Sequence, residues 1–105
     1  MSLNKICIIG NLGKDPESKE LSSGQLITKI SVCVSEKYKG EEQTQWFTCK
    51  AFGNQASFIH RNAQTGSQVY VEGSMKSNEY QGKTYWDLMI QKVEILNGRK
   101  PNGNN

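Results

Sequence analysis

The sequence has 105 residues, 35% of them hydrophobic and 22% charged, and a formal net charge of +3 at pH 7. This length and composition indicate one compact domain and exclude a chain that is disordered throughout. The mildly basic charge permits an anionic partner without requiring one. No apolar run approaches the roughly 20 residues of a membrane span and no signal-peptide pattern is present, so we expect a cytoplasmic protein without a membrane partner.

The first strand is predicted over residues 5–10, "KICIIG". Turn residues follow in "GNLGKDPES", where Gly13 and Asp15-Pro16 interrupt regular structure. Residues 25–35 alternate most clearly between two faces, as expected for a long strand with one wet side. One face carries Thr28, Ile30, Val32 and Val34. The other carries Lys29, Ser31, Cys33 and Ser35.

A polar hairpin loop around Gly40 is predicted next, in "EKYKGEEQ", and leads into a strand within "TQWFTCKAFGN". With a period of two, this strand has a small core face of Phe47, Cys49 and Ala51. Its other face is unusual, because a lysine and a threonine lie between two large aromatic side chains. That face carries Trp46, Thr48, Lys50 and Phe52.

One short helix is predicted in "NQASFIHRNAQTG", with Asn54 as its N-cap and Gly66 at its C-terminus. Strands resume at residues 67–74, continue towards Tyr80, and follow again in "TYWDLMIQKVEIL". Five strands with a helix between the third and fourth is the element order of the OB-fold, an all-β, five-stranded Greek-key barrel. We expect this domain to span residues 1–98 and residues 99–105 to form a flexible tail remnant.

Candidate catalytic groups do not cluster in the sequence. His60 is the only histidine, and no Ser-His-Asp or Cys-His arrangement forms around it. The Gly-x-x-Gly-Lys stretch in "GNLGKDP" has Asp15 where a phosphate-binding loop needs Ser or Thr. Three scattered cysteines without a C-x-x-C pair favour free thiols over a disulfide or metal framework. We therefore predict no enzyme activity, no metal and no cofactor.

The unusual strand face suits single-stranded nucleic acid, which is bound by aromatic faces that stack on bases and lysines that follow the backbone. Trp46 and Phe52 are six residues apart, about 20 Å along a strand, and would hold bases several nucleotides apart. Lys50 lies between them and stays charged in a wet groove, whereas desolvation in a core would be costly. On this strand alone, a second small core with Lys50 reaching solvent explains the pattern equally well.

Two other segments favour the nucleic-acid hypothesis. Tyr38 lies between Lys37 and Lys39 in a polar loop, and Tyr80 lies in "KSNEYQGK" between Lys76 and Lys83. Aromatic residues in such stretches have little core to join. The predicted stacking residues are therefore Trp46, Phe52, Tyr38 and Tyr80, and the predicted phosphate contacts are Lys37, Lys39, Lys50, Lys76 and Lys83. We assign five further aromatic residues to the core or an interface: Phe47, Phe58, Tyr70, Tyr85 and Trp86.

Three motifs in order, "NKICIIGNLGKDPE", "QWFTCKAFG" and "GSQVYVEGSMKSNEY", resemble the bacterial single-stranded DNA-binding protein family over residues 1 to about 98. The resemblance implies an OB-fold that forms a homo-oligomer, usually a homotetramer. It also implies sequence-independent binding of single-stranded DNA in DNA replication, recombination and repair, at the bacterial nucleoid. By position, Trp46 and Phe52 match family stacking residues, whereas Tyr38 and Tyr80 replace frequent tryptophans.

The sequence also departs from the family pattern. Phe47 stands where a histidine associated with subunit contacts is frequent, and "TYWDLM" only loosely matches a Thr-Thr-Glu pattern, with Asp87 nearest its acidic position. Family members end in an acidic tip that recruits repair and replication proteins. This sequence ends in "PNGNN", so we do not expect that recruitment from it; trimming and natural loss of the tip both remain open.

The resulting hypothesis is a non-catalytic binder of single-stranded DNA. Two alternatives remain open from the residues: an OB-fold module that binds other proteins, which need not keep the aromatic residues, and an RNA binder of the cold-shock or translation-factor type. An OB-fold enzyme is a more distant alternative. The sequence leaves open the size of the binding site, any cooperativity along DNA, and a chromosomal, phage or plasmid origin.

Overall fold

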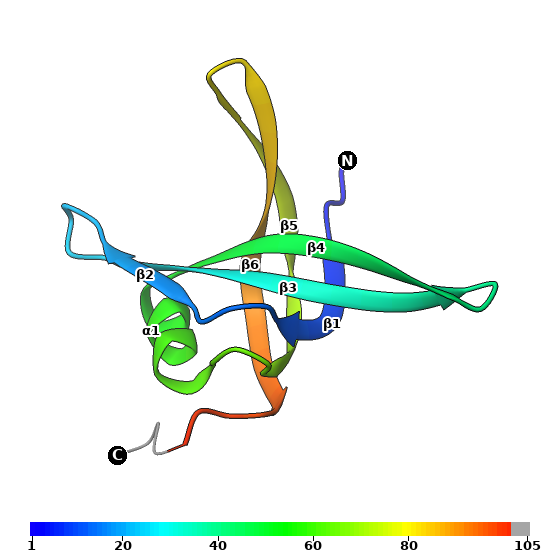
Figure 1. Ribbon diagram of the computed structural model, residues 1–105. Helices are drawn as coiled ribbons and strands as arrows, with labels where there is room; N and C mark the ends of the chain where they lie inside the picture. The colour runs from blue at the N-terminus through cyan, green and yellow to red at the C-terminus, as the bar shows by residue number, and fades with distance from the viewer. Residues whose placement is uncertain (102–105) are drawn as a thin grey trace.

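In the computed structural model, which describes residues 1–101, the chain consists mainly of β-strands (Figure 1). The described chain contains six strands and one helix. In order, they are β1 (Ile6–Leu12), β2 (Glu17–Glu20), β3 (Leu26–Tyr38), β4 (Glu41–Phe52), α1 (Gly53–Asn62), β5 (Gln68–Tyr80) and β6 (Lys83–Asn97).

Five of these strands close into a barrel. The strands follow the order β1-β5-β6-β4-β3, and β3 pairs with β1 to close the ring. All of these pairings are antiparallel except the short β4–β6 contact, in which Cys49 lies opposite Leu88 and Lys50 opposite Met89. With α1 between β4 and β5, this confirms the predicted OB-fold.

The barrel interior is filled by side chains that alternate along the strands, as predicted for β3 and β4. In β4, Cys49 and Ala51 are fully buried, whereas Trp46 and Phe52 face outward. In β3, Thr28, Ile30 and Val32 point inward. The buried hydrophobic residues are Ile8, Leu12, Ile30, Val32, Cys49, Ala51, Ala56, Ile59, Ala63, Val69, Val71, Leu88 and Ile90.

Strand β2 is an element that the sequence pattern did not predict. Its residues, "ESKE", lack the β-branched and aromatic side chains typical of strands. They pair with the long β3 strand, from Glu17 opposite Lys29 to Glu20 opposite Leu26. A free length of the β3 edge therefore supplies the hydrogen bonds that the local composition does not favour. Because β2 lies outside the closed ring, the barrel itself still has five strands.

Helix α1 is shorter than predicted, and its ends differ. It begins at Gly53 and ends at Asn62, so Asn54 is not the N-cap; Phe52 holds that position, in extended conformation. Gly66 has a φ of +87° but lies in the turn beyond the helix. The buried side of the helix carries Ala56, Ile59 and Asn62.

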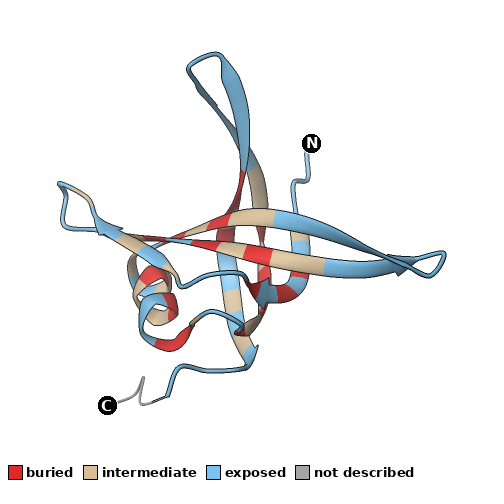
Figure 2. Cartoon of the chain, in the orientation of Figure 1, coloured by how far each residue is buried: buried red, intermediate tan, exposed pale blue. Residues whose placement is uncertain are grey.

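Two hairpins extend beyond the barrel as long arms (Figure 1). The β3–β4 arm turns at Lys39-Gly40 and the β5–β6 arm at Gln81-Gly82, and all four residues have positive φ. Two central residues with positive φ are typical of the type I′ turn, whose twist matches that of the flanking strands. The predicted hairpin around Gly40 is confirmed, but its loop is shorter than the predicted 36–43, because strand pairing continues to Tyr38 opposite Glu41. Figure 2 shows that both arms are exposed near their tips.

The C-terminal end of the described chain lies against α1. The side chain of Arg99 donates a hydrogen bond of 3.0 Å to Oδ1 of Asn62 and lies 5.5 Å from the ring centroid of Phe58. The backbone N–H of Lys100 donates to the carbonyl of Asn62. The predicted tail covers 99–105, of which residues 102–105 lie outside the described residues.

In the described part of the chain, no helix is both long enough and apolar enough to span a membrane.

A hydrogen-bond network runs from the buried Thr28 to the exposed His60 and joins β2, β3 and α1. Oγ1 of Thr28, which is fully buried, donates to the carbonyl of Ala56 at 3.0 Å. The same oxygen lies 2.8 Å from Oγ of Ser18, which in turn lies 2.9 Å from Nδ1 of His60. Replacing Thr28 removes the group at the centre of this network.

We predict that Thr28→Val lowers the free energy of unfolding by about 1–3 kcal/mol, because the shape is kept but the carbonyl of Ala56 loses its buried donor. Urea denaturation followed by circular dichroism measures this change. Thr44→Val, on the exposed part of β4, is the control and should change the same quantity by no more than about 0.5 kcal/mol. Equal stability of Thr28→Val and the unaltered chain would contradict the role of this network.

Candidate nucleic-acid interface

The outer face of β3 and β4 carries the first two predicted stacking residues. The side chain of Trp46 is 61% exposed and that of Phe52 38% exposed, so neither ring belongs to the core. Trp46 lies opposite Cys33 and Phe52 opposite Ile27 in the antiparallel register. Between the two rings, the same face carries Thr48 and Lys50, opposite Ser31 and Lys29. The alternative of a second small core is therefore wrong.

The ring of Trp46 lies directly over Gly13. A Cβ atom added at Gly13 would lie 2.6 Å from two carbons of the indole ring, closer than real side chains approach one another. The turn after β1 therefore has room for this ring only because residue 13 has no side chain. Gly13, which was predicted from the sequence as a turn residue, thus also provides the surface on which the Trp46 ring packs.

The other two predicted stacking residues lie next to the turns of the arms. Tyr38 ends β3 and Tyr80 ends β5, and each is 64% exposed. Nζ of Lys39 lies 5.5 Å from the ring centroid of Tyr38, within the range of a cation–π contact. The remaining predicted phosphate contacts on the arms are also exposed, namely Lys37, Lys76 and Lys83.

A groove of ≈560 Å³ runs between the outer face of β3–β4 and the β5–β6 arm. Of the predicted site residues it brings together Lys50 and Tyr80, whereas Trp46 and Phe52 lie on the barrel face outside its lining and Tyr38 on the other arm. The lining residues are Lys29, Thr48, Lys50, Asn78, Glu79, Tyr80, Tyr85, Trp86 and Asp87.

Two aromatic residues of this lining were missed as site candidates. Tyr85 is 49% exposed and Trp86 is 58% exposed, so of the two predicted places, core or interface, the core is excluded for both. Tyr85 lies opposite Asn78, and Lys83 opposite Tyr80, which places Tyr85 on the same face of the arm as Tyr80. Extending the period-two alternation back from the buried Leu88 places Tyr85 on the outer face, so this signal could have found it. The same alternation places Trp86 on the inner face, and its exposure depends on how far the arm extends beyond the barrel.

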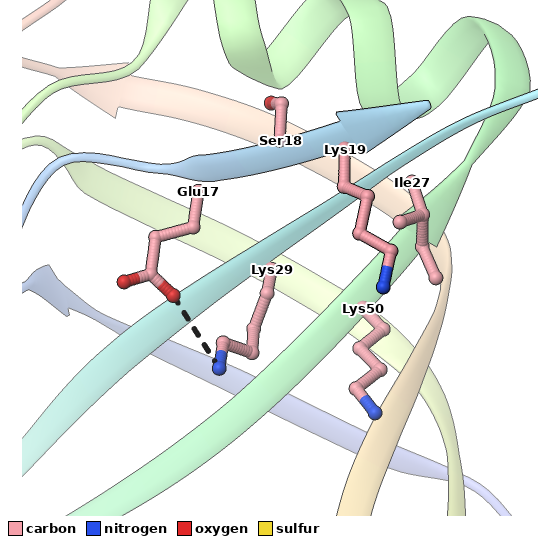
Figure 3. A pocket seen from close by; sticks show the side chains of 6 residues that line it. All are labelled: Glu17, Ser18, Lys19, Ile27, Lys29 and Lys50. Atoms are coloured by element: carbon pink, nitrogen blue, oxygen red, sulfur yellow. Dashed lines mark ion pairs between the residues drawn. The ribbon is translucent and has the colours of Figure 1, made fainter. Parts of the chain in front are cut away.

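A second hollow, of ≈390 Å³, adjoins the groove and shares Lys29 and Lys50 with it. Figure 3 shows Lys19, Lys29 and Lys50 extending from three neighbouring strands on the same side. Glu17 partly balances their charge, because its carboxylate lies 3.3 Å from Nζ of both Lys14 and Lys29. The hydrogen bonds from these two lysines lower the pKa of Glu17.

Lys50 differs from the lysines of the arms because it has a buried partner. Its Nζ lies 3.0 Å from Oδ2 of Asp87, whose side chain is only 8% exposed. Nδ2 of Asn78 donates to the same carboxylate oxygen at 2.8 Å.

Nearby, burial raises the pKa of the Cys49 thiol to about 12, and the negative charge of Asp87 adds to this shift. Over residues 1–101, no group of three or more His, Cys, Asp or Glu is arranged to hold a metal ion.

Comparison with known proteins identifies the family. The model of the single-strand binding protein family matches residues 3–96. The chain belongs to this family. It is 33% identical over 112 residues to the single-stranded DNA-binding proteins of Neisseria meningitidis serogroups A and B, covering 97% of this chain. It is 32% identical over 107 residues to the single-stranded DNA-binding protein of Xanthomonas campestris pv. campestris, covering 92% of this chain.

Family membership confirms the resemblance drawn from the three sequence motifs. The chain matches 64% of the length of the Neisseria relatives and 62% of the Xanthomonas relative. The matched part corresponds to the barrel with its two arms. These relatives are named for DNA binding rather than for an enzymatic reaction.

We predict that Gly13→Ala displaces the Trp46 ring, because the added methyl group would occupy the place of the indole. The ring can rotate away, so the chain should stay folded. Fluorescence of Trp46, measured in a Trp86→Phe background to remove the second indole, should change in emission maximum. Gly24→Ala serves as the control, since no atom lies within 4 Å of a Cβ there. An unchanged emission spectrum for Gly13→Ala would contradict the placement of the ring.

Proposed function

We propose that the protein binds single-stranded DNA without sequence preference, and thereby protects and organises it in DNA replication, recombination and repair. The observation that carries the proposal is a set of exposed aromatic rings beside lysines, on the barrel face and on both arms. Such rings stack on any base, since every base has a flat face, and each stacked base contributes about 1–3 kcal/mol. Membership of the single-strand binding protein family supports the same function.

The proposed roles follow the position of each side chain. Trp46 and Phe52 stack on bases along the barrel, and Tyr38 and Tyr80 stack on bases at the arms. Tyr85 joins them, because it is 49% exposed and lies on the groove face next to Tyr80. Lysines of the two arms contact phosphates, and this set consists of Lys37, Lys39, Lys76 and Lys83. Lys50 was predicted to do the same, but its Nζ is paired with Oδ2 of Asp87 at 3.0 Å.

We also propose that copies of the chain associate, as a homotetramer, through the outer face of β1. This proposal is supported by Ile9, which is 51% exposed beside its cross-strand partner Tyr70. A cytoplasmic location near the nucleoid is proposed as well. The free cysteines Cys7, Cys33 and Cys49 suit a reducing compartment.

The test of the binding proposal is the double variant Trp46→Ala, Phe52→Ala. We expect oligo-dT to quench the tryptophan fluorescence of the unaltered chain, and we expect the double variant to bind about 2–6 kcal/mol more weakly, because two stacking faces are lost. Fluorescence anisotropy of labelled oligo-dT measures both affinities on the same scale, whichever tryptophans remain.

The matched control is Phe47→Leu, which alters the partly buried aromatic residue on the opposite face of β4. It should leave the affinity for oligo-dT almost unchanged. Competition with oligo-U separates DNA from RNA as the preferred ligand. Unchanged affinity in the double variant would refute the assignment of Trp46 and Phe52, and preference for oligo-U would refute DNA as the ligand.

The proposed association predicts that Ile9→Glu lowers the molar mass in solution, because a buried carboxylate between two copies would be unpaired. Light scattering coupled to size-exclusion chromatography measures this mass. Ser22→Glu, in the exposed turn between β2 and β3, is the control and should leave the mass of the assembly unchanged. A monomeric mass for the unaltered chain, or an intact tetramer for Ile9→Glu, would count against association through β1.

A further inference from the structure

We propose that Asp87 is a positioning residue that holds the partly buried Lys50 against the β5–β6 arm and away from phosphates. In this arrangement the centre of the groove takes bases, and the lysines of the arms contact the phosphates. The inference rests on the proposed binding of single-stranded DNA and deepens it. It differs from the expectation drawn from the sequence, in which Lys50 contacts a phosphate.

The first support is the depth of the Lys50–Asp87 pair. Nζ of Lys50 lies 3.0 Å from Oδ2 of Asp87, and their side chains are 31% and 8% exposed. Of the ion pairs between described residues, this is the shortest and the most buried. The others join side chains of which at least one is about half exposed, with separations of 3.3–3.7 Å. Lys50 is therefore the lysine with the least solvent and the closest counterion.

The second support is that the partner carboxylate is fixed in place. Asn78 lies on β5 and Asp87 on β6, and the amide of Asn78 donates to Oδ2 at 2.8 Å. Lys50 approaches the same oxygen from β4. The contact therefore ties the base of the β5–β6 arm to the barrel. If Lys50 left to contact a phosphate, Asp87 would keep its charge in a nearly closed site with one neutral donor.

The free-energy cost of separating Lys50 from Asp87 decides which partner Lys50 keeps. A buried charge that loses its partner is strongly unfavourable, because the protein interior does not replace the lost hydration. A lysine–phosphate contact in an open groove gains much less, since water and salt screen it. Lys50 therefore keeps Asp87 as its partner when the groove is occupied, and the pair adds no net charge to the groove.

The lysines of the two arms differ from Lys50 in their surroundings. Between residues 1 and 101, no carboxylate lies within 4.0 Å of the amino groups of Lys37, Lys39, Lys76 and Lys83, all of which are exposed. Their charges are available to phosphates. The groove lining has instead the neutral Lys50–Asp87 pair together with the rings of Tyr80 and Tyr85. Its other charged residues are Glu79 and Lys29, and Lys29 is paired with Glu17. This layout favours a base at the centre and backbone phosphates towards the arms.

Salt dependence of binding tests the inference, because each phosphate neutralised on single-stranded DNA contributes a slope of about −0.7 in log K against log [salt]. Affinity for oligo-dT is measured by anisotropy from 50 to 200 mM NaCl. We expect Lys50→Met to keep the slope of the unaltered chain. Lys76→Met, the matched control on the exposed arm, should make the slope shallower by about 0.7.

Asp87→Asn gives the complementary result. It releases Lys50 to a phosphate, so the slope should become steeper by about 0.7, which is an additional loss of about 2.6-fold in affinity over this fourfold range of salt. A purely structural role of Asp87 would not steepen the slope. If Lys50→Met is too unstable to measure, the double variant Lys50→Met, Asp87→Asn removes both charges together and should keep the slope of the unaltered chain.

A slope that becomes shallower in Lys50→Met, by as much as in Lys76→Met, would overturn the inference and leave the binding function intact. An unchanged slope in Asp87→Asn would overturn it as well. Failure of the unaltered chain to bind oligo-dT would instead overturn the proposed function and, with it, this inference. Thermal unfolding of each variant, followed by circular dichroism, checks that the slopes are compared between folded proteins.

Discussion

The strict alternation of side chains along β3 and β4 is the constraint on which the remaining structure depends. One face of β4 gives Cys49 and Ala51 to the barrel interior, both fully buried, and this fixes the opposite face outward. A shift of register by one residue would exchange the two faces and put Lys50 into the core. The packing that stabilises the barrel therefore also determines which rings face solvent. In this protein the core and the proposed binding surface are two sides of the same two strands.

Much of this could be predicted from the sequence because it depends on local periodicity. The alternation of residues 28–34 and 46–52 placed the buried and exposed sides of β3 and β4 correctly, and the position of the helix among the strands indicated the OB-fold. Trp46, Phe52, Tyr38 and Tyr80 were recognised as exposed, because each is an aromatic residue beside lysines or polar side chains. These features require no knowledge of which strands meet.

Features that depend on contacts between distant segments were not predictable in this way. Strand β2 forms because the edge of β3 is free there, although "ESKE" has little strand propensity. Lys50 was predicted to face solvent, but its partner Asp87 is 37 positions away, on a strand that pairs with β4 over only a short stretch. Trp86 shares the period-two face of the buried Leu88 and resembles a core residue until the length of the arm is known. Its exposure follows from tertiary structure, not from its neighbours in sequence.

The projection of both hairpins beyond the barrel has a mechanical consequence. A two-stranded ribbon outside a core is only marginally stable by itself, so its outer residues can bend at little cost to the folded domain. The rings of Trp46 and Phe52 are mounted on the barrel, whereas those of Tyr38 and Tyr80 are carried by the ribbons. The protein thus combines rings on a rigid barrel with rings on two flexible arms, and this combination suits the proposed binding of a DNA strand whose path varies.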